Sequence, residues 1–235
     1  MSTEVGGVGV VAGLSVELRL LRHLGGGVRR PLAYTSAYGV GPGRASEAAH
    51  SLLAAGARAL VSWGTAAALA PELAPGCIVV PEAILGADGQ RYSPAGDWQG
   101  RVYRALEGRV PLDTGPLQET FSVLRGPQEK AALGRRWGAR AADMESAAVA
   151  EAARRAGVPF LVVRAIVDSI GAAVPECVVR ATRPEGTLAL GTLLAGALAH
   201  PSQIMALVPL ALGFRAARRG LRRVARVAGA ELLRP

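Results

Sequence analysis

The sequence is short of several residue types, and each shortage narrows what the chain can be. Aromatic residues make up 4% of its 235 residues, and Lys130 is the sole lysine, which we attribute to a compositional bias rather than to function. Cys77 and Cys177 form neither a metal-ligand spacing nor a disulfide framework. No apolar run reaches the ~18 residues of a membrane span. The N-terminus shows no secretory pattern, so we expect a reducing cytoplasm.

What the sequence does contain indicates one α/β domain followed by a basic tail. Half of the residues are hydrophobic, which excludes a disordered chain, and the length suffices for one substantial core. The net charge of +9 is uneven, because residues 201–235 carry seven arginines and one acid. We therefore expect a domain over residues 1–200 and a separate tail over residues 201–235.

Residues 143–168 carry the clearest local pattern. An alanine-rich segment predicts a helix that ends at Gly157. The continuous apolar run at residues 160–163 is typical of a strand buried on both faces. Asp168 follows that strand, and open α/β sheets bind ligands at the carboxyl ends of their strands. The pattern predicts a ligand site near Asp168.

Three segments earlier in the chain contain further candidate site residues. Glu17 lies in the first turn of a helix predicted from Ser15, where an acid simply complements the helix dipole unless other evidence gives it a role. A glycine-rich turn at residues 39–44 could present backbone N–H groups to an anion, although such turns are also ordinary connectors. A third strand at residues 59–62 leads into a loop that holds Thr65.

These segments together resemble the purine and uridine phosphorylase superfamily, and within it the methylthioadenosine/S-adenosylhomocysteine nucleosidases. The resemblance is carried by Met144-Glu145 at a helix start, by the V-P-F strand beginning at Val158, and by the R-A-I-V-D ending at residues 164–168. Residues 12–21 and 63–80 match two more family segments in the right order. The resemblance implies a single three-layer α/β/α domain with a mixed central sheet, here followed by a helical C-terminal extension.

The resemblance also implies what each site residue does. Asp168 would protonate the purine N7 as general acid, Glu17 would deprotonate water, and Arg164 would orient the nucleophile. The implied substrate-binding residues are Met144 and Glu145 at the ribose and Gly64, Thr65 and Ala66 at the nucleophile. No metal and no cofactor are implied, although phosphate could replace water as co-substrate. The alternatives are a structural ion pair of Arg164 with Glu17 or Asp168, and a helix cap for Asp143.

The chain departs from the family pattern at three places. Val167 replaces the serine that braces the catalytic aspartate, and Ala67 and Ala68 replace glycines. Ser62 stands where the phosphorylases have an arginine, which removes a charge-assisted partner of phosphate and favours water. Residues 86–118 correspond to the region that shapes the substrate pocket in the family.

The tail narrows the expected function. An apolar segment at residues 203–214 precedes six arginines at helical spacing: Arg215, Arg218, Arg219, Arg222, Arg223 and Arg226. This pattern favours a peripheral helix on the inner membrane surface over the solvated face of a core helix. It does not predict a nucleic-acid partner. The tail resembles that of hopanoid-associated members of the superfamily, which remove adenine from adenosylhopane.

The expected protein is therefore an oligomeric enzyme, a homodimer or larger, that converts adenosylhopane to ribosylhopane with water or phosphate. The first alternative is a soluble methylthioadenosine/S-adenosylhomocysteine nucleosidase or purine nucleoside phosphorylase. The second is a nucleoside-binding protein without catalysis, which the substitutions at Val167, Ala67 and Ala68 suggest.

Overall fold

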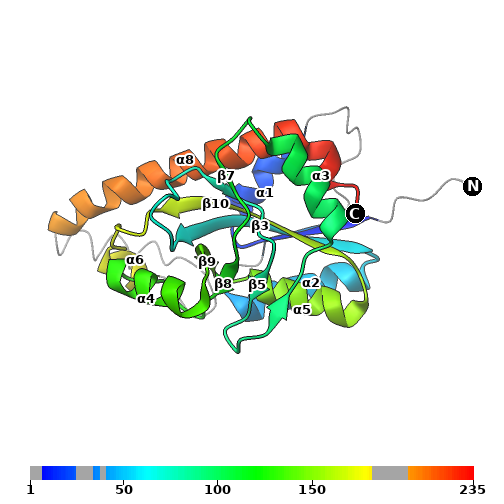
Figure 1. Ribbon diagram of the computed structural model, residues 1–235, viewed down its shortest axis with the longest axis horizontal. Helices are drawn as coiled ribbons and strands as arrows, with labels where there is room; N and C mark the ends of the chain where they lie inside the picture. Colours follow the sequence, from blue (N-terminus) through cyan, green and yellow to red (C-terminus); the bar gives the residue numbers. More distant parts are fainter. Residues whose placement is uncertain (1–6, 25–33, 38–40, 182–200) are drawn as a thin grey trace, which may run out of the picture.

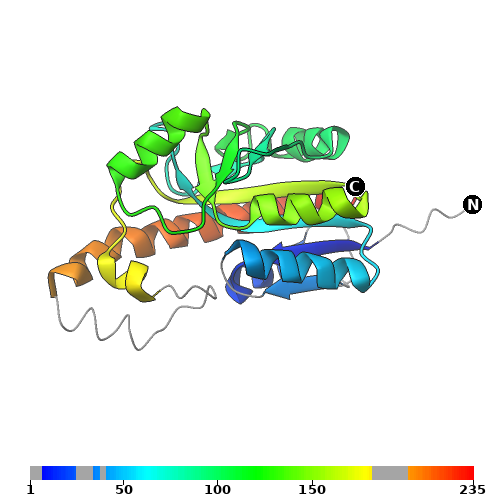
Figure 2. The same ribbon diagram turned by 90° about the horizontal axis from the view of Figure 1, so that it is seen from below.

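The computed structural model describes residues 7–24, 34–37, 41–181 and 201–235. A mixed β-sheet lies between two layers of helices (Figures 1 and 2), which confirms the predicted three-layer α/β/α fold. The strands are β1 (Val8–Ala12), β2 (Tyr34–Ala37), β3 (Ala59–Ala68), β4 (Ile78–Val79), β5 (Ile84–Leu85), β6 (Arg91–Tyr92), β7 (Leu112–Asp113), β8 (Leu117–Glu119), β9 (Ala141–Asp143) and β10 (Phe160–Asp168). The helices are α1 (Ser15–Leu18), the 3-10 helix η1 (Arg19–His23), α2 (Pro42–Ala54), α3 (Gly96–Leu106), α4 (Pro127–Trp137), α5 (Ser146–Ala156), α6 (Glu176–Ala181) and α8 (Pro201–Leu232).

Strand β3 divides the sheet and creates the place for a site. It pairs with β10 along most of its length, so its other partners lie on the opposite side. On that side its first half pairs with β1 in parallel, and its last two residues, Ala67 and Ala68, pair with β9 in antiparallel. Residues 63–66 lie between these two partners. Sheets open at such a change of partner, and ligands bind there, beyond the carboxyl ends of the parallel strands.

Each face of the sheet has its own hydrophobic core. Helices α2 and α5 cover one face with small side chains such as Ala48, Ala49 and Ala150, which let the two helices lie close together. Helices α3 and α8 and the short η1 cover the other face, where Trp98 and Leu221 are buried. Helix α5 ends as predicted at Gly157, whose φ of 64° is in the left-handed region.

Helix α8 is a continuous core helix that packs on β10 and α3 (Figure 1). Ala217, Leu221, Val224 and Ala228 form a buried stripe along it. A Cβ atom at Gly213 would overlap the carbonyl oxygen of Val167, so the glycine allows the helix to approach β10 closely. The six predicted arginines lie on the outer side, and all but the half-buried Arg222 are exposed. The solvated face of a core helix, the alternative to a separate peripheral helix, is therefore what the fold shows.

Other predictions are corrected in detail. Strand β3 runs on to Ala68, so Thr65 and Ala66 lie on a strand and not in a loop. The sequence favours a loop from Ser169 to Arg183, but this segment contains α6. It also favours a helix over residues 184–198, which lie outside the described residues, and a strand over residues 32–40, whose ends lie outside them too. No helix in the described part of the chain is long and apolar enough to cross a membrane.

Candidate active site

A pocket opens beside the divided strand β3 and brings together most of the predicted site residues. Its walls include seven of the eight: Glu17, Thr65, Ala66, Met144, Glu145, Arg164 and Asp168. Gly64, the eighth, lies next to the pocket, pairs with Arg164 across the sheet and contacts the side chains of Arg164 and Glu17. Residues from α1, from β3 and β10, and from the end of β9 and the two residues after it thus converge at one place, as the order of the motifs predicts.

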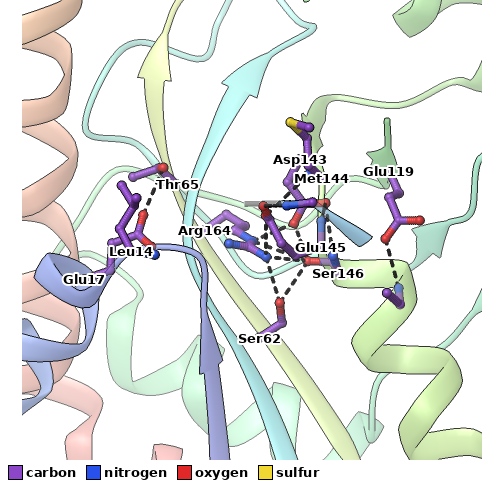
Figure 3. A network of polar contacts seen from close by, with 12 residues as sticks. Leu14, Glu17, Ser62, Thr65, Glu119, Asp143, Met144, Glu145, Ser146 and Arg164 are labelled. Atoms are coloured by element: carbon purple, nitrogen blue, oxygen red, sulfur yellow. Dashed lines mark hydrogen bonds and ion pairs between the residues drawn. The ribbon is translucent and has the colours of Figure 1, made fainter. Parts of the chain in front are cut away.

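Glu17 is held at the polar end of the pocket by three contacts (Figure 3). Its carboxylate accepts hydrogen bonds from the Thr65 hydroxyl at 3.1 Å and from the Leu14 backbone N–H at 3.1 Å. The Trp63 indole donates to its carbonyl oxygen. Burial raises the pKa of Glu17, although the charge of Arg164 and the two hydrogen bonds oppose the shift. A buried carboxylate with a raised pKa suits a base that accepts a proton near neutral pH.

Arg164 is 1% exposed, and its charge is used within a buried network (Figure 3). Its guanidinium lies 2.6 Å from the Asp143 carboxylate and 3.5 Å from that of Glu145, and it donates to Ser62 at 2.7 Å. The ion pairs of Arg164 are with Asp143 and Glu145 rather than with the alternatives Glu17 and Asp168, although its charge still lowers the pKa of Glu17. A Cβ at Gly64 would overlap the guanidinium, so this glycine provides the space that brings Arg164 near Glu17.

Asp143 and Glu145 have different roles at the start of α5. Asp143, the last residue of β9, accepts the Ser146 N–H at 3.3 Å and pairs with Arg164, but the N-cap position of α5 belongs to Glu145 and not to Asp143 as predicted. Glu145 accepts the Gly41 N–H at 3.0 Å. The donor that the glycine-rich turn offers to an anion is therefore bound to the protein's own carboxylate. Burial, with a smaller effect from Asp143, raises the pKa of Glu145 to about 7 against the opposing charge of Arg164.

Asp168 stands at the end of β10 and is directed by a bulge and by a lysine. The register between β10 and β3 shifts between Ile166 and Asp168, which re-aims the side chains beyond the shift. Asp168 forms an ion pair with Lys130 of α4. Burial raises the pKa of Asp168, and the Lys130 charge opposes the shift. Nothing in the sequence around Lys130 indicates this role, apart from its being the one lysine in an arginine-rich chain.

The apolar wall of the pocket comes in part from segments that the sequence did not indicate, among them Val174 and Val178 in and before α6. The loop after β8 contributes Val123 and Leu124, and helix α8 contributes Leu210 and Phe214. None of the described residues between 86 and 118 lines the pocket, so the expectation for that region does not hold within this chain. The pocket therefore has a polar end with carboxylates and an apolar end bounded by α8.

Glu119 is a second buried carboxylate with a pKa raised to about 7, and it lies outside the pocket. Burial is the main cause, followed by the charge of Asp143, its neighbour across the strand pair. The Ala148 N–H donates to it at 2.9 Å, which opposes the shift. A raised pKa means that the folded state binds an extra proton between pH 4.5 and about 7, so stability is lost as the pH rises through this window.

We expect Glu119→Gln to stabilise the protein by about 1–3 kcal/mol at pH 8 and to change little at pH 5. The glutamine oxygen can still accept the Ala148 N–H, but it carries no charge to desolvate. Urea unfolding of both proteins at the two pH values measures the effect. Glu82→Gln, an exposed acid for which no such burial exists, is the control. Equal free energies of unfolding at pH 8 would show that Glu119 is not a buried anion there.

No group of three or more histidine, cysteine, aspartate or glutamate side chains that could hold a metal ion occurs among the described residues. The titratable groups of the pocket are instead organised by hydrogen bonds and by two cations, Arg164 and Lys130. This arrangement can supply an acid and a base on different sides of a bound molecule.

Comparison with known proteins gives a consistent result. The sequence model of the phosphorylase superfamily matches residues 21–183. A curated relative, the 5'-methylthioadenosine/S-adenosylhomocysteine nucleosidase of Treponema pallidum (strain Nichols), is 34% identical over 124 residues. That match covers 50% of this chain and 44% of the relative, so it spans less than half of the relative's length.

Two solved structures share the fold. The 5'-methylthioadenosine/S-adenosylhomocysteine nucleosidase from S. pneumoniae, in complex with the transition-state inhibitor MT-ImmA, has a TM-score of 0.64 at 17% identity, covering 94% of this chain and 98% of that one. The futalosine hydrolase of Helicobacter pylori strain 26695 has a TM-score of 0.63 at 17% identity, covering 95% and 98%. At such identities these two likenesses concern the fold alone.

Proposed function

Since this chain belongs to the phosphorylase superfamily, we propose that it is a nucleosidase that breaks the N-glycosidic bond of a purine nucleoside. The observation that carries the proposal is the pairing, in one pocket, of the buried Glu17 and the half-buried Asp168, two carboxylates with raised pKa values. One can donate a proton to the leaving base, and the other can remove a proton from the attacking water. Glu145 lies with them and can accept hydrogen bonds from ribose hydroxyls.

The proposed reaction needs no cofactor, and a residue of the pocket gives or accepts each proton that moves. The bond between the anomeric carbon and the purine breaks with its electron pair on the base, and Asp168 protonates N7. The sugar develops positive charge, which the nearby carboxylates of Glu17 and Glu145 stabilise. Water adds to the anomeric carbon and gives its proton to Glu17, which Thr65 and Leu14 hold in place.

We propose water rather than phosphate as the nucleophile. The guanidinium of Arg164 is already surrounded by Asp143, Glu145, Ser62 and Ser146. A phosphate dianion at the polar end would meet Glu17 and Glu145 without an uncommitted cation among the described residues that line the pocket. The negative charges of the phosphate and of the two carboxylates would repel one another, whereas a neutral water molecule is not repelled.

We propose an adenosine derivative with a large apolar group, adenosylhopane in the first place, as the substrate. Leu210 and Phe214 of α8, with Val123 and Leu124, form an apolar end that suits a hydrocarbon substituent. A smaller nucleoside such as methylthioadenosine is the alternative, which the relative from Treponema pallidum favours. We propose a homodimer as the assembly, with Phe121, 72% exposed between the pocket residues Thr120 and Ser122, as one of its interface residues.

Incubation with adenosylhopane and with methylthioadenosine, each with and without phosphate, tests these proposals. We expect free adenine and an unphosphorylated sugar product at a rate that phosphate does not raise. A ribosyl phosphate product would show a phosphorylase instead. Binding without release of any base would show a nucleoside-binding protein without catalysis.

We further propose that the outer side of α8 docks the protein peripherally on an anionic membrane from the cytoplasmic side. Val208 and Leu212 are 55% and 59% exposed, and they continue at helical spacing into Arg215, Arg219 and Arg226. Apolar residues followed by arginines on one helix face are typical of membrane-surface helices. The apolar end of the pocket is on the same helix, so a lipid-like substrate could enter from the bilayer.

Arg215→Gln/Arg219→Gln is expected to weaken binding to anionic vesicles roughly 30-fold at low salt, since each basic side chain contributes about 1 kcal/mol near the surface. Arg135→Gln/Arg136→Gln, an exposed pair on α4, is the matched control and should bind like the wild type. Sedimentation with vesicles measures both. If the wild type fails to sediment with anionic vesicles at low salt, the docking proposal is wrong, while the nucleosidase proposal is unaffected.

A further inference from the structure

Lys130 is the only lysine of the chain, and its side chain is completely buried. Its ammonium group donates to the Asp168 carboxylate, to the Ser169 carbonyl at 2.9 Å and to the Ala172 carbonyl at 2.8 Å. All three donors of the ammonium are therefore used. Burial of a lysine is costly unless it is paired and hydrogen-bonded, and every one of these partners belongs to the segment that begins at Asp168.

The only local support for the Asp168 carboxylate among the described residues is a hydrogen bond to its own backbone. The preceding residue is Val167, whose side chain cannot form a hydrogen bond, and the register of β10 shifts at this point. Lys130 reaches the carboxylate from another element, α4, 38 positions earlier in the chain. The lysine thus fixes the direction of Asp168 where neither the bulge nor its neighbour can.

We propose that Lys130 is a positioning residue that aims Asp168 into the pocket and stabilises the carboxylate left when Asp168 protonates the departing base. This role rests on the proposed nucleosidase function. The proton moves from Asp168 to the purine N7 as the glycosidic bond breaks, and the electron pair of that bond goes to the base. The Asp168 carboxylate then forms a full ion pair with the Lys130 ammonium, whose own protons stay in place. Asp168 regains a proton from water before the next cycle.

The charges that face Asp168 allow this role to be isolated. Within the described chain, Lys130 is the only charged side chain that acts on the pKa of Asp168, and its effect is to lower it. The α8 residues on the pocket wall, Leu210 and Phe214, carry no charge. Removal of Lys130 should therefore raise the pKa of Asp168 and make it a weaker acid, whereas a lysine that merely ties the segment down would not affect proton donation.

The first test compares the pH dependence of kcat in Lys130→Met, Lys130→Arg and the wild type. We expect Lys130→Met to lower kcat about 10- to 100-fold at pH 7 with KM within a few-fold, because proton donation contributes at most about 10²- to 10⁴-fold in all. The alkaline limb, where Asp168 loses its proton, should move to higher pH. Lys130→Arg keeps the charge and should keep the limb near its wild-type position, so it serves if Lys130→Met folds poorly.

Arg140→Met is the matched control, since it removes the cation of another ion pair, 2.8 Å from Asp113, away from the pocket. It should leave both kcat and the alkaline limb unchanged. An unchanged limb in Lys130→Met, in a protein that does release base, would overturn the role of Lys130 alone. A wild type that releases no base from any nucleoside would overturn the proposed function and this role with it.

The second test uses the fact that there is only one lysine. Protein labelled with ¹⁵N at lysine Nζ gives a single side-chain NMR signal, which comes from Lys130. We expect this signal to shift at the pH of the alkaline limb in the wild type and to lose that response in Asp168→Asn. The same titration in both proteins would show that the ammonium does not sense Asp168, and the proposal would be wrong.

Discussion

Asp168→Asn is expected to lower kcat for adenine release by roughly 10²- to 10⁴-fold while KM changes little. Asparagine has the same shape as aspartic acid and can still lie against the neighbouring pocket wall, but it has no acidic proton. Adenine leaves poorly as an anion, so the loss should appear in bond cleavage and not in binding. Steady-state kinetics on the preferred nucleoside measure the effect.

A change of leaving group separates proton donation from general damage to the pocket. A 4-nitrophenyl riboside needs no proton to depart, so Asp168→Asn should cleave it almost as fast as the wild type does. Asp113→Asn is the matched control, because Asp113 is also ion-paired but does not line the pocket. Near-normal turnover of adenine nucleosides by Asp168→Asn would remove this residue from the mechanism.

Glu17→Gln is expected to lower kcat by a similar factor, roughly 10²- to 10⁴-fold, for a different reason. The glutamine oxygen can still accept one of the two hydrogen bonds, from Thr65 or from Leu14, so helix α1 should keep its place. What is lost is the group that takes a proton from water. The cleavage of the 4-nitrophenyl riboside should therefore fall as well, in contrast to its behaviour in Asp168→Asn.

Azide gives a diagnostic for the missing base. It attacks without losing a proton, so it should restore much of the activity of Glu17→Gln and yield a glycosyl azide. Glu72→Gln, an exposed acid outside the pocket, is the control and should need no rescue. If azide fails to raise the rate of Glu17→Gln although the protein is folded, Glu17 serves another purpose than proton removal.

The parts of the fold that the sequence predicts well are those with a strong local pattern. Strand β10 and helix α5 follow from a continuous apolar run and from alanines ended by Gly157. The second half of β3 does not follow from a local pattern, because Gly64, Thr65 and the alanines after them have little strand preference of their own. That half is a strand because β10 pairs with it residue by residue, which is a tertiary effect.

The site divides in the same way. The order of the motifs places Glu17, Glu145 and Asp168 together, since each follows or opens an element at one edge of the sheet. Leu210 and Phe214 of α8 line the pocket and Lys130 of α4 contacts Asp168, and nothing in their local sequence indicates these contacts. The packing of the tail on the core was not predicted because its arginines dominate the composition, whereas the small and apolar residues between them form the buried stripe.

One side of α8 connects the pocket with the hydrophobic core through a continuous row of apolar side chains. Leu210 and Phe214, on the pocket wall, fall on the same side of the helix as Ala217, Leu221, Val224 and Ala228. An apolar group bound against Leu210 and Phe214 would extend this row of apolar contacts. We then expect a bound ligand to slow amide hydrogen exchange along residues 207–214, because opening this end of the helix would require the ligand to leave first.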